Sequence, residues 1–77
     1  MRGYLRTLRA EHGLTMQDAA ARLGITKQYW EMIENGKRQR KMDIDMAARI
    51  ASLFDVSLQF VVDQENALLL QSEGATA

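Results

Sequence analysis

The basic side chains of this sequence gather in its first half, where they could bind a polyanion. Residues 1–41 contain nine Lys or Arg and four Asp or Glu, which gives this part a net charge of +5. Residues 42–77 contain Arg49 and six acidic residues, a net charge of −5, so the whole chain is neutral. Such a separation is typical of a protein with one polyanion-facing end, but small helical domains also segregate charge by chance. Charge alone leaves both interpretations open.

Acid–base and metal chemistry have little support in the sequence. The candidates for acid–base catalysis are the aspartates after residue 42, namely Asp43, Asp45, Asp55 and Asp63. No nucleophile, second histidine or phosphate loop accompanies them. His12 is the only histidine and Cys is absent, which excludes a thiolate zinc site, a multi-histidine metal cluster and a disulfide framework. We therefore predict that the protein is not an enzyme and uses no cofactor or metal.

Length and hydropathy narrow the class of protein further. A chain of 77 residues allows one small domain. The longest apolar run, residues 67–70, cannot span a bilayer, and residues 1–6 contain no apolar core of the signal-peptide type. We expect a cytoplasmic location.

Helical periodicity extends over the whole chain, which contains no Pro. It predicts five helices, at about residues 2–12, 16–23, 27–34, 44–54 and from 58 onward. Side-chain oxygens of Thr15, Thr26, Asp43 and Ser57 can cap the last four of these helices, because each can accept a free backbone N–H of the first turn. The sequence therefore predicts an all-α fold with clearly marked helix starts.

The helix predicted at 44–54 carries two apolar stripes. The stripes are Ile44, Ala47, Ala48 and Ala51 on one side, and Met46, Ile50 and Leu53 on the other. A helix with two such stripes is expected to be buried on most of its circumference.

Two of the predicted helices meet the steric demands of a helix-turn-helix unit at residues 15–35. Ala20 is small enough to let the two helix axes approach at a steep angle. Gly24 supplies the turn residue with a positive φ. Apolar residues that pin the pair onto the rest of the domain are Leu23, Ile25 and Ile33. Flanked by capped helices of the right length, this pattern is a strong signal for the unit.

Several segments resemble the Cro/CI-type (xenobiotic-response-element, XRE) helix-turn-helix family of transcriptional regulators. They are Leu14-Thr15, Ala20, Leu23-Gly24-Ile25-Thr26 and Ile33-Glu34-Asn35-Gly36-Lys37-Arg38. The similarity covers residues 4–62. It implies a compact five-helix bundle of the lambda-repressor-like type, with residues 1–62 as the helix-turn-helix DNA-binding domain. Residues 63–77 are expected to form a helical extension or a flexible tail.

The same resemblance implies that the helix at 27–34 enters the DNA major groove. Lys27 and Gln28 fall at the family's base-reading positions, and Met32 lies one turn later on the same face. Their chemistry suits this role, because Lys can donate to guanine, Gln can pair with adenine, and an apolar side chain can contact the thymine methyl group. The alternative is that Lys27 and Gln28 are merely solvated residues at a helix start.

Other positions are implied to bind phosphates or to support the unit. The implied phosphate ligands are Thr26, Tyr29, Asn35, Lys37, Arg38 and Arg40. The loop cations have the alternative role of a solubilising surface, and Tyr29 could equally cover an edge of the core. Arg9 and Glu34 match a paired position that ties the first helix to the third, so both are interpreted as structural.

The sequence departs from the family pattern at three positions. Met16 stands where the family usually has Gln, with Gln17 next to it. Trp30 stands where Ile or Val is usual, and Ala19 where Leu is usual. Because both of the latter positions face the core, we interpret them as a large-for-small exchange that keeps the core volume roughly constant.

Apolar residues are abundant in the last third of the chain. Leu58 and Val61 could simply complete the core. The sharper hypothesis is that Leu58, Phe60 and Val62 form a two-fold dimer contact, which would set two recognition helices roughly 34 Å apart.

Together with the resemblance, these features imply a sequence-specific regulator of transcription that binds double-stranded DNA. We expect a repressor that reads an inverted-repeat operator as a homodimer. The alternative is an antitoxin or another protein-interaction module whose C-terminal segment binds a partner protein.

Overall fold

The computed structural model describes the backbone of residues 1–76 and the side chains of residues 1–70. This range contains five helices and no strand. The helices are α1 (Gly3–Glu11), α2 (Met16–Leu23), α3 (Lys27–Glu34), α4 (Ile44–Leu53) and α5 (Leu58–Thr76). The predicted all-α, five-helix fold is confirmed, and the predicted helix ends agree with these bounds to within one residue for the first four helices.

Side-chain caps start four of the five helices, as the sequence predicts. The Oγ1 atom of Thr15 accepts the backbone N–H of Asp18 at 3.1 Å, and the Asp18 carboxylate accepts the N–H of Thr15 at 3.0 Å. This reciprocal pair is a capping box with Asp in place of Glu. The other caps are Thr26 to Tyr29, Asp43 to Met46 and Ser57 to Phe60.

All five helices contribute to one hydrophobic core. Its largest fully buried apolar side chains are Trp30, Phe54, Leu5, Ile33, Ile50 and Val61. The rings of Trp30 and Phe54 pack together in a tilted arrangement, with 6.3 Å between their centroids. Helix α2 supplies the small residues Ala19 and Ala20 to this core. Their small volume is consistent with a core that also holds the large indole of Trp30 from α3.

One expectation about α4 is wrong. Ile44 and Ala48 were predicted to lie on a buried stripe, but both are exposed, Ile44 by 70%. The buried residues of α4 are Met46, Ala47, Ile50 and Ala51, which share one face. At 100° per residue, Ile44 and Ala48 fall just beyond the edge of that face. The helix therefore buries one broad face instead of two separate stripes.

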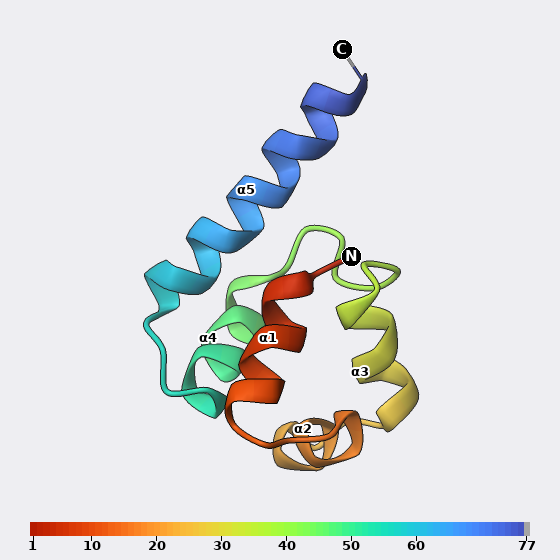
Figure 1. The fold of residues 1–77 in the computed structure, drawn as a ribbon, viewed down its shortest axis with the longest axis vertical. Coiled ribbons are helices and arrows are strands. Elements are labelled where there is room, and N and C mark those ends of the chain that lie inside the picture. The colour runs from red at the N-terminus through yellow and green to blue at the C-terminus, as the bar shows by residue number, and fades with distance from the viewer. Residues whose placement is uncertain (77) are drawn as a thin grey trace.

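The helices are arranged as a compact group of four from which α5 projects (Figure 1). α2 and α3 pack against each other at one end of this group, and α4 packs against α5. The segment between α3 and α4 runs past the N-terminus, where the N–H of Arg2 donates to the carbonyl of Glu34 at 2.7 Å. The far half of α5 extends away from the other helices.

Helix α5 crosses the predicted domain boundary between residues 62 and 63 without a break. Residues 63–76 continue the helix, and residue 77 of the predicted tail lies outside the described residues. That residues 1–62 form the domain by themselves stays a prediction. Within the part of the chain described here, no helix has both the length and the apolar character needed to cross a membrane.

Candidate nucleic-acid interface

The turn between α2 and α3 brings the two helices together. Gly24 ends α2 in the left-handed conformation, with φ = 71°. The N–H of Ile25 then donates to the carbonyl of Ala20 at 3.0 Å, which folds the chain back over the end of α2. Ala20 is only 2% exposed and belongs to the hydrophobic core against which both helices pack. This is the geometry of a helix-turn-helix unit.

Helix α3 has an outward face that carries the three predicted base readers. Lys27 and Gln28 are exposed, and Met32 is 39% exposed. The opposite face of the same helix holds Trp30 and Ile33, both fully buried. The structure therefore brings the three candidates together on one accessible surface at the edge of the molecule.

The sequence analysis missed Glu31 on this face. Glu31 is exposed and lies between Lys27 and Gln28 when the helix is viewed end-on, because it is four residues from one and three from the other. A carboxylate at this position can accept a hydrogen bond from cytosine and repels phosphate. Its helical spacing from Lys27 was the signal that could have identified it.

The start of α3 presents polar groups suited to a phosphate. Thr26 is exposed, and its Oγ1 atom accepts the N–H of Tyr29 at 3.0 Å. The Thr26 hydroxyl keeps its own hydrogen, so it can still donate to an anion. The free backbone N–H groups of the first helical turn can also donate to an anion bound there.

Tyr29 lies at the rim of the core. Its ring is half-buried against the core, and its hydroxyl accepts a hydrogen bond from the Nε2 atom of Gln39 at 3.2 Å. The hydroxyl hydrogen of Tyr29 remains available. The two roles left open by the sequence, a core edge and a phosphate contact, are therefore compatible in this geometry.

Basic residues follow directly after α3. Asn35 ends the helix, and Gly36 then takes a positive φ of 80°. The N–H groups of Lys37 and Arg38 both turn back to the carbonyl of Met32, at 2.8 and 3.2 Å. The side chains of Asn35, Lys37, Arg38, Arg40 and Lys41 are all exposed. We call residues 37–41 the basic loop, which follows the C-terminal end of α3.

Arg9 and Trp30 form a polar cluster around the buried carboxylate of Glu34. The Arg9 guanidinium donates to both carboxylate oxygens of Glu34, at 2.9 and 2.8 Å, and Glu34 is only 1% exposed. The Nε1–H of Trp30 donates to the same carboxylate at 2.7 Å. Hydrogen bonding of the Arg9 guanidinium to the Glu34 carboxylate raises the pKa of Arg9. The Trp30 bond was missed, although the spacing of four residues between Trp30 and Glu34 could have revealed it.

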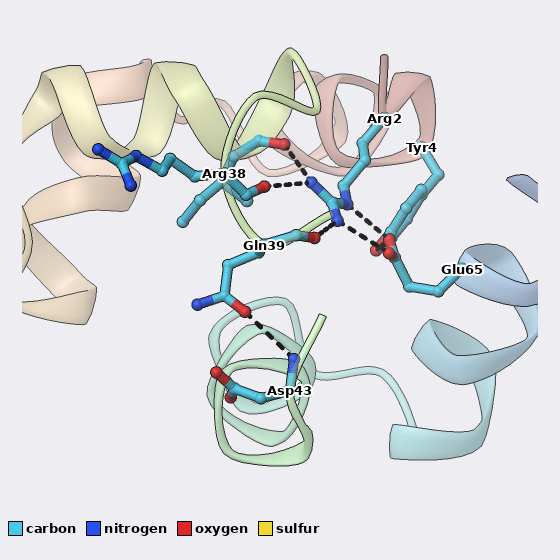
Figure 2. A network of polar contacts seen from close by, with 7 residues as sticks. Arg2, Tyr4, Arg38, Gln39, Asp43 and Glu65 are labelled. Atoms are coloured by element: carbon cyan, nitrogen blue, oxygen red, sulfur yellow. Dashed lines mark hydrogen bonds and ion pairs between the residues drawn. The ribbon is translucent and has the colours of Figure 1, made fainter. Parts of the chain in front are cut away.

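The burial of Arg2 was not predicted from the sequence. The sequence analysis counted Arg2 only as one of the basic charges, but its side chain is 3% exposed and enclosed by α1, the basic loop and α5. Figure 2 shows its guanidinium between the carbonyl groups of Arg38 and Gln39 on one side and the Glu65 carboxylate on the other. No pattern in the sequence relates Arg2 to Glu65, since they are 63 positions apart.

The predicted dimer residues lie on α5 with different exposures. Leu58 is 36% exposed, whereas Phe60 and Val62 are half-buried, and Phe60 packs against the core. Larger apolar exposures occur at Ile44 and at Leu70, which is 67% exposed. Val62 and Ile44 line a shallow groove between α4 and α5.

Comparison with known proteins identifies the class. The model of the helix-turn-helix family HTH_3 matches residues 5–61, and the chain belongs to this family. It is therefore a DNA-binding protein of the transcription-regulator class, which confirms the predicted XRE-type resemblance. The chain is 33% identical over 66 residues to the uncharacterized HTH-type transcriptional regulator MJ0272 of Methanocaldococcus jannaschii, and this alignment covers 86% of the chain and 97% of the relative. No solved structure gives a significant match.

Proposed function

We propose that this protein is a repressor that binds an inverted-repeat operator as a homodimer, with α3 of each protomer in the major groove. The observation that carries this proposal is the outward face of α3, where Lys27, Gln28 and Met32 are exposed while the other face is buried in the core. A helix that is rigidly attached by one face and accessible on the other suits insertion into a groove.

Direct base contacts come from the outward face of α3. Lys27 donates to the acceptors of guanine, and Gln28 pairs with the donor and acceptor edge of adenine. Met32 contacts a thymine methyl group. Glu31 accepts from the amino group of cytosine if its carboxylate reaches a base edge. Family membership and exposure on a single face support these roles.

Phosphate contacts come from both ends of α3. Thr26 and Tyr29 contact the backbone near the helix start, and Asn35, Lys37, Arg38 and Arg40 contact it beyond the helix end. Such contacts fix the orientation of the protein but read no sequence, whereas the base contacts between them provide specificity. The free hydroxyl hydrogens and the exposed cations support this division of roles.

A two-fold dimer through Leu58, Phe60 and Val62 would place two copies of α3 on one side of the DNA. Partial exposure of these side chains at the start of α5 supports the contact. Half-sites are then expected roughly 34 Å apart, one turn of B-DNA. A repressor of this type would act by covering its operator.

Selection of bound sequences from a random duplex pool tests the proposed function. The expected result is an inverted repeat whose half-sites are separated by about one helical turn. Binding of the selected duplex should weaken steeply with added salt, because phosphate contacts release counterions. A pool that yields no symmetric site at any salt concentration contradicts the proposal. A reporter gene behind the selected operator then tests repression, which must be lost when the operator is scrambled.

The projecting part of α5 supports a second candidate function as a protein-binding module of the antitoxin kind. Leu69 and Leu70 are 39% and 67% exposed on a helix that extends beyond the four-helix group. If α5 binds a partner protein there, the partner should protect residues beyond Asp63 from protease. The same cleavage rate with and without a candidate partner contradicts this role.

A further inference from the structure

We propose that Arg2 is a positioning residue for DNA binding: it contacts no DNA, and it fixes the basic loop for phosphate contact while Glu65 of α5 fixes Arg2. The proposal rests on the proposed function, because it takes the basic loop as a phosphate ligand. The feature that carries it is a single buried guanidinium that joins the end of α3, the basic loop and α5 (Figure 2).

Every N–H of the Arg2 guanidinium has a partner. The Nε atom donates to Glu65 at 2.8 Å, and Nη1 donates to the carbonyls of Ile33 and Arg38 at 2.5 and 3.1 Å. The Nη2 atom donates to the carbonyl of Gln39 and to the second Glu65 oxygen at 3.0 Å. A guanidinium offers five donors in a fixed plane, whereas a lysine offers three on one nitrogen. Lysine therefore cannot make the same set of bonds.

The basic loop needs this support because its backbone is strained. Gln39 has a φ of 53°, in the left-handed region that non-glycine residues rarely occupy. Two backbone carbonyls of the loop converge on Arg2, while the Gln39 side chain bonds Tyr29 on α3 and the N–H of Asp43 at the start of α4. With Arg2 changed, the carbonyls lose their buried donor and the strained conformation loses a main restraint.

The loop directs the Arg38 side chain away from Arg2, whereas Arg40 lines the same cavity as Arg2 and Glu65. Figure 2 shows the carbonyl of Arg38 directed at the Arg2 guanidinium, while the Arg38 guanidinium extends in the opposite direction. One residue thus has its backbone bound to the interior and its charged side chain free to contact a phosphate. Binding by a loop whose backbone is already ordered avoids the entropy cost of ordering that backbone when DNA arrives.

Glu65 completes the arrangement from α5. Its carboxylate compensates the buried charge of Arg2 and also accepts the hydroxyl of Tyr4 at 2.5 Å. Burial, together with the neighbouring Glu65 carboxylate, raises the pKa of Tyr4, so this hydroxyl remains a donor at neutral pH. Helix α5 is thereby connected to the basic loop.

The first test asks whether Glu65→Gln strengthens or weakens DNA binding. The Glu65→Gln change removes a negative charge, so a pure charge effect would tighten DNA binding. We expect the opposite, a loss of about threefold to tenfold, which is the range for one long side chain that must be ordered on binding. The matched control is Asp63→Asn on the same helix, where Asn keeps an oxygen for the Gln59 amide. This control should bind DNA as tightly as the wild type or slightly more tightly.

The second test compares two arginines of the N-terminal region with charge held constant. Arg2→Lys should weaken binding to the selected operator by about threefold to tenfold and reduce the slope of log affinity against log salt by about 1. Arg6→Lys, at an exposed position of α1, should leave both unchanged. All variants are measured well below their own melting temperatures, so that loss of folded protein does not contribute.

A double-mutant cycle separates positioning from a general structural role. Arg38→Ala should cost less affinity in the Arg2→Lys protein than in the wild type, because the loop side chain is already misplaced. Lys27→Ala, at the start of α3, should cost the same in both. Hydrogen exchange at the amides of residues 38–41 should be faster in Arg2→Lys and in Glu65→Gln than in their controls.

Three outcomes overturn the inference. Operator affinity and salt slope that are the same in Arg2→Lys and Arg6→Lys would show that Arg2 does not act on DNA binding. Tighter DNA binding by Glu65→Gln would mean that only the loss of its negative charge matters and that Glu65 does not position Arg2. Additive losses for Arg2→Lys and Arg38→Ala would mean that Arg2 does not act through the loop. A wild-type protein that binds no duplex instead overturns the proposed function itself and removes the basis of this inference.

Discussion

At the scale of single residues, α3 divides its side chains between two tasks. Trp30 and Glu34 face inward and hold the helix to the domain, while Lys27 and Gln28 face outward and are free of the core. Because the two sets do not overlap, substitutions on the outward face should change DNA binding without changing stability, and substitutions on the inward face should do the reverse.

Replacing Gln28 with Ala should relax base preference at one position of each half-site. The loss of a bidentate contact with adenine is expected to cost about 1–3 kcal/mol against the selected operator and little against duplexes that already carry another base there. Competition binding with operators mutated one base pair at a time measures this. An equal loss against every duplex would contradict a base-reading role for Gln28.

Replacing Arg38 with Ala should weaken binding to all duplexes alike. The exposed Arg38 side chain is a predicted phosphate ligand, so its loss should reduce the salt slope by about 1 while base preference stays as it is. Titrations of specific and random duplexes at several salt concentrations provide the measurement. A selective loss on the operator alone would assign Arg38 to base reading instead.

The hydrogen bonds to the buried Glu34 carboxylate are expected to stabilise the fold. Glu34→Ala leaves the buried Trp30 N–H and the partly exposed Arg9 guanidinium without their shared acceptor, and a buried donor left without an acceptor costs about 1–3 kcal/mol. Chemical denaturation followed by circular dichroism measures the free energy of unfolding. Glu31→Ala on the exposed face of the same helix is the control and should change it by less than about 0.5 kcal/mol. Equal losses in the two variants would contradict this assignment.

At the scale of elements, helix starts decide where the recognition unit lies. The cap at Thr15 sets the first residue of α2, Gly24 ends α2, and the cap at Thr26 starts α3 two residues later. Local chemistry thereby fixes both lengths and the turn between them. The orientation of α3 within the domain is then set by the packing of its inward face.

The capping box of α2 should make stability depend on pH in the acid range. Hydrogen bonding from the Thr15 backbone lowers the pKa of Asp18 in the folded protein. A carboxyl with a lowered folded pKa stabilises the fold above its ordinary pKa of about 4, and this contribution is lost as pH falls through the lowered value.

Denaturation of the wild type and of Asp18→Asn between pH 6 and 2 tests this dependence. The stability difference between the two proteins should be constant above about pH 5 and should shrink as the solution becomes more acidic. A difference that grows with acidification would contradict the direction of the Asp18 pKa shift.

At the scale of the whole molecule, the positive and negative halves of the sequence differ in their place in the fold. The basic loop and the outward face of α3 lie in the positive part of the sequence, while α5 carries acidic residues and projects away from the four-helix group. In the proposed complex the negative part would lie away from the DNA, which would limit its repulsion from phosphates. The start of α5 is then free for contact with a second copy.

A Leu58→Glu variant tests the proposed dimer. An interface of about 1,200 Å² or more should hold the wild type as a dimer at tens of micromolar, and a charge at Leu58 should shift it to a monomer. Sedimentation measures the mass, and binding to one half-site should be retained while binding to the full inverted repeat becomes weaker. Asp63→Asn is a control that should keep the oligomeric state. A wild type that sediments as a monomer would contradict the dimer.

Much of the fold could be predicted because its signals are local. The caps at Thr15, Thr26, Asp43 and Ser57 and the positive φ of Gly24 follow from residue chemistry within one turn of each position, and all of them are confirmed. The burial of Ile44 was predicted wrongly, because periodicity locates an apolar stripe but does not say whether a neighbouring element covers it.

The sequence by itself determined the five helices and the helix-turn-helix unit, because short-range hydrogen bonding and helical spacing set them. The family resemblance added Lys27, Gln28 and Met32 on the outward face, but not Glu31. Only the tertiary structure decided that Arg2 is buried and that α5 reaches the basic loop through Glu65. Arg2 and Glu65 are in contact although 63 positions separate them in the sequence. Their ion pair depends on how α1 and α5 pack, which no spacing between neighbours in the sequence encodes.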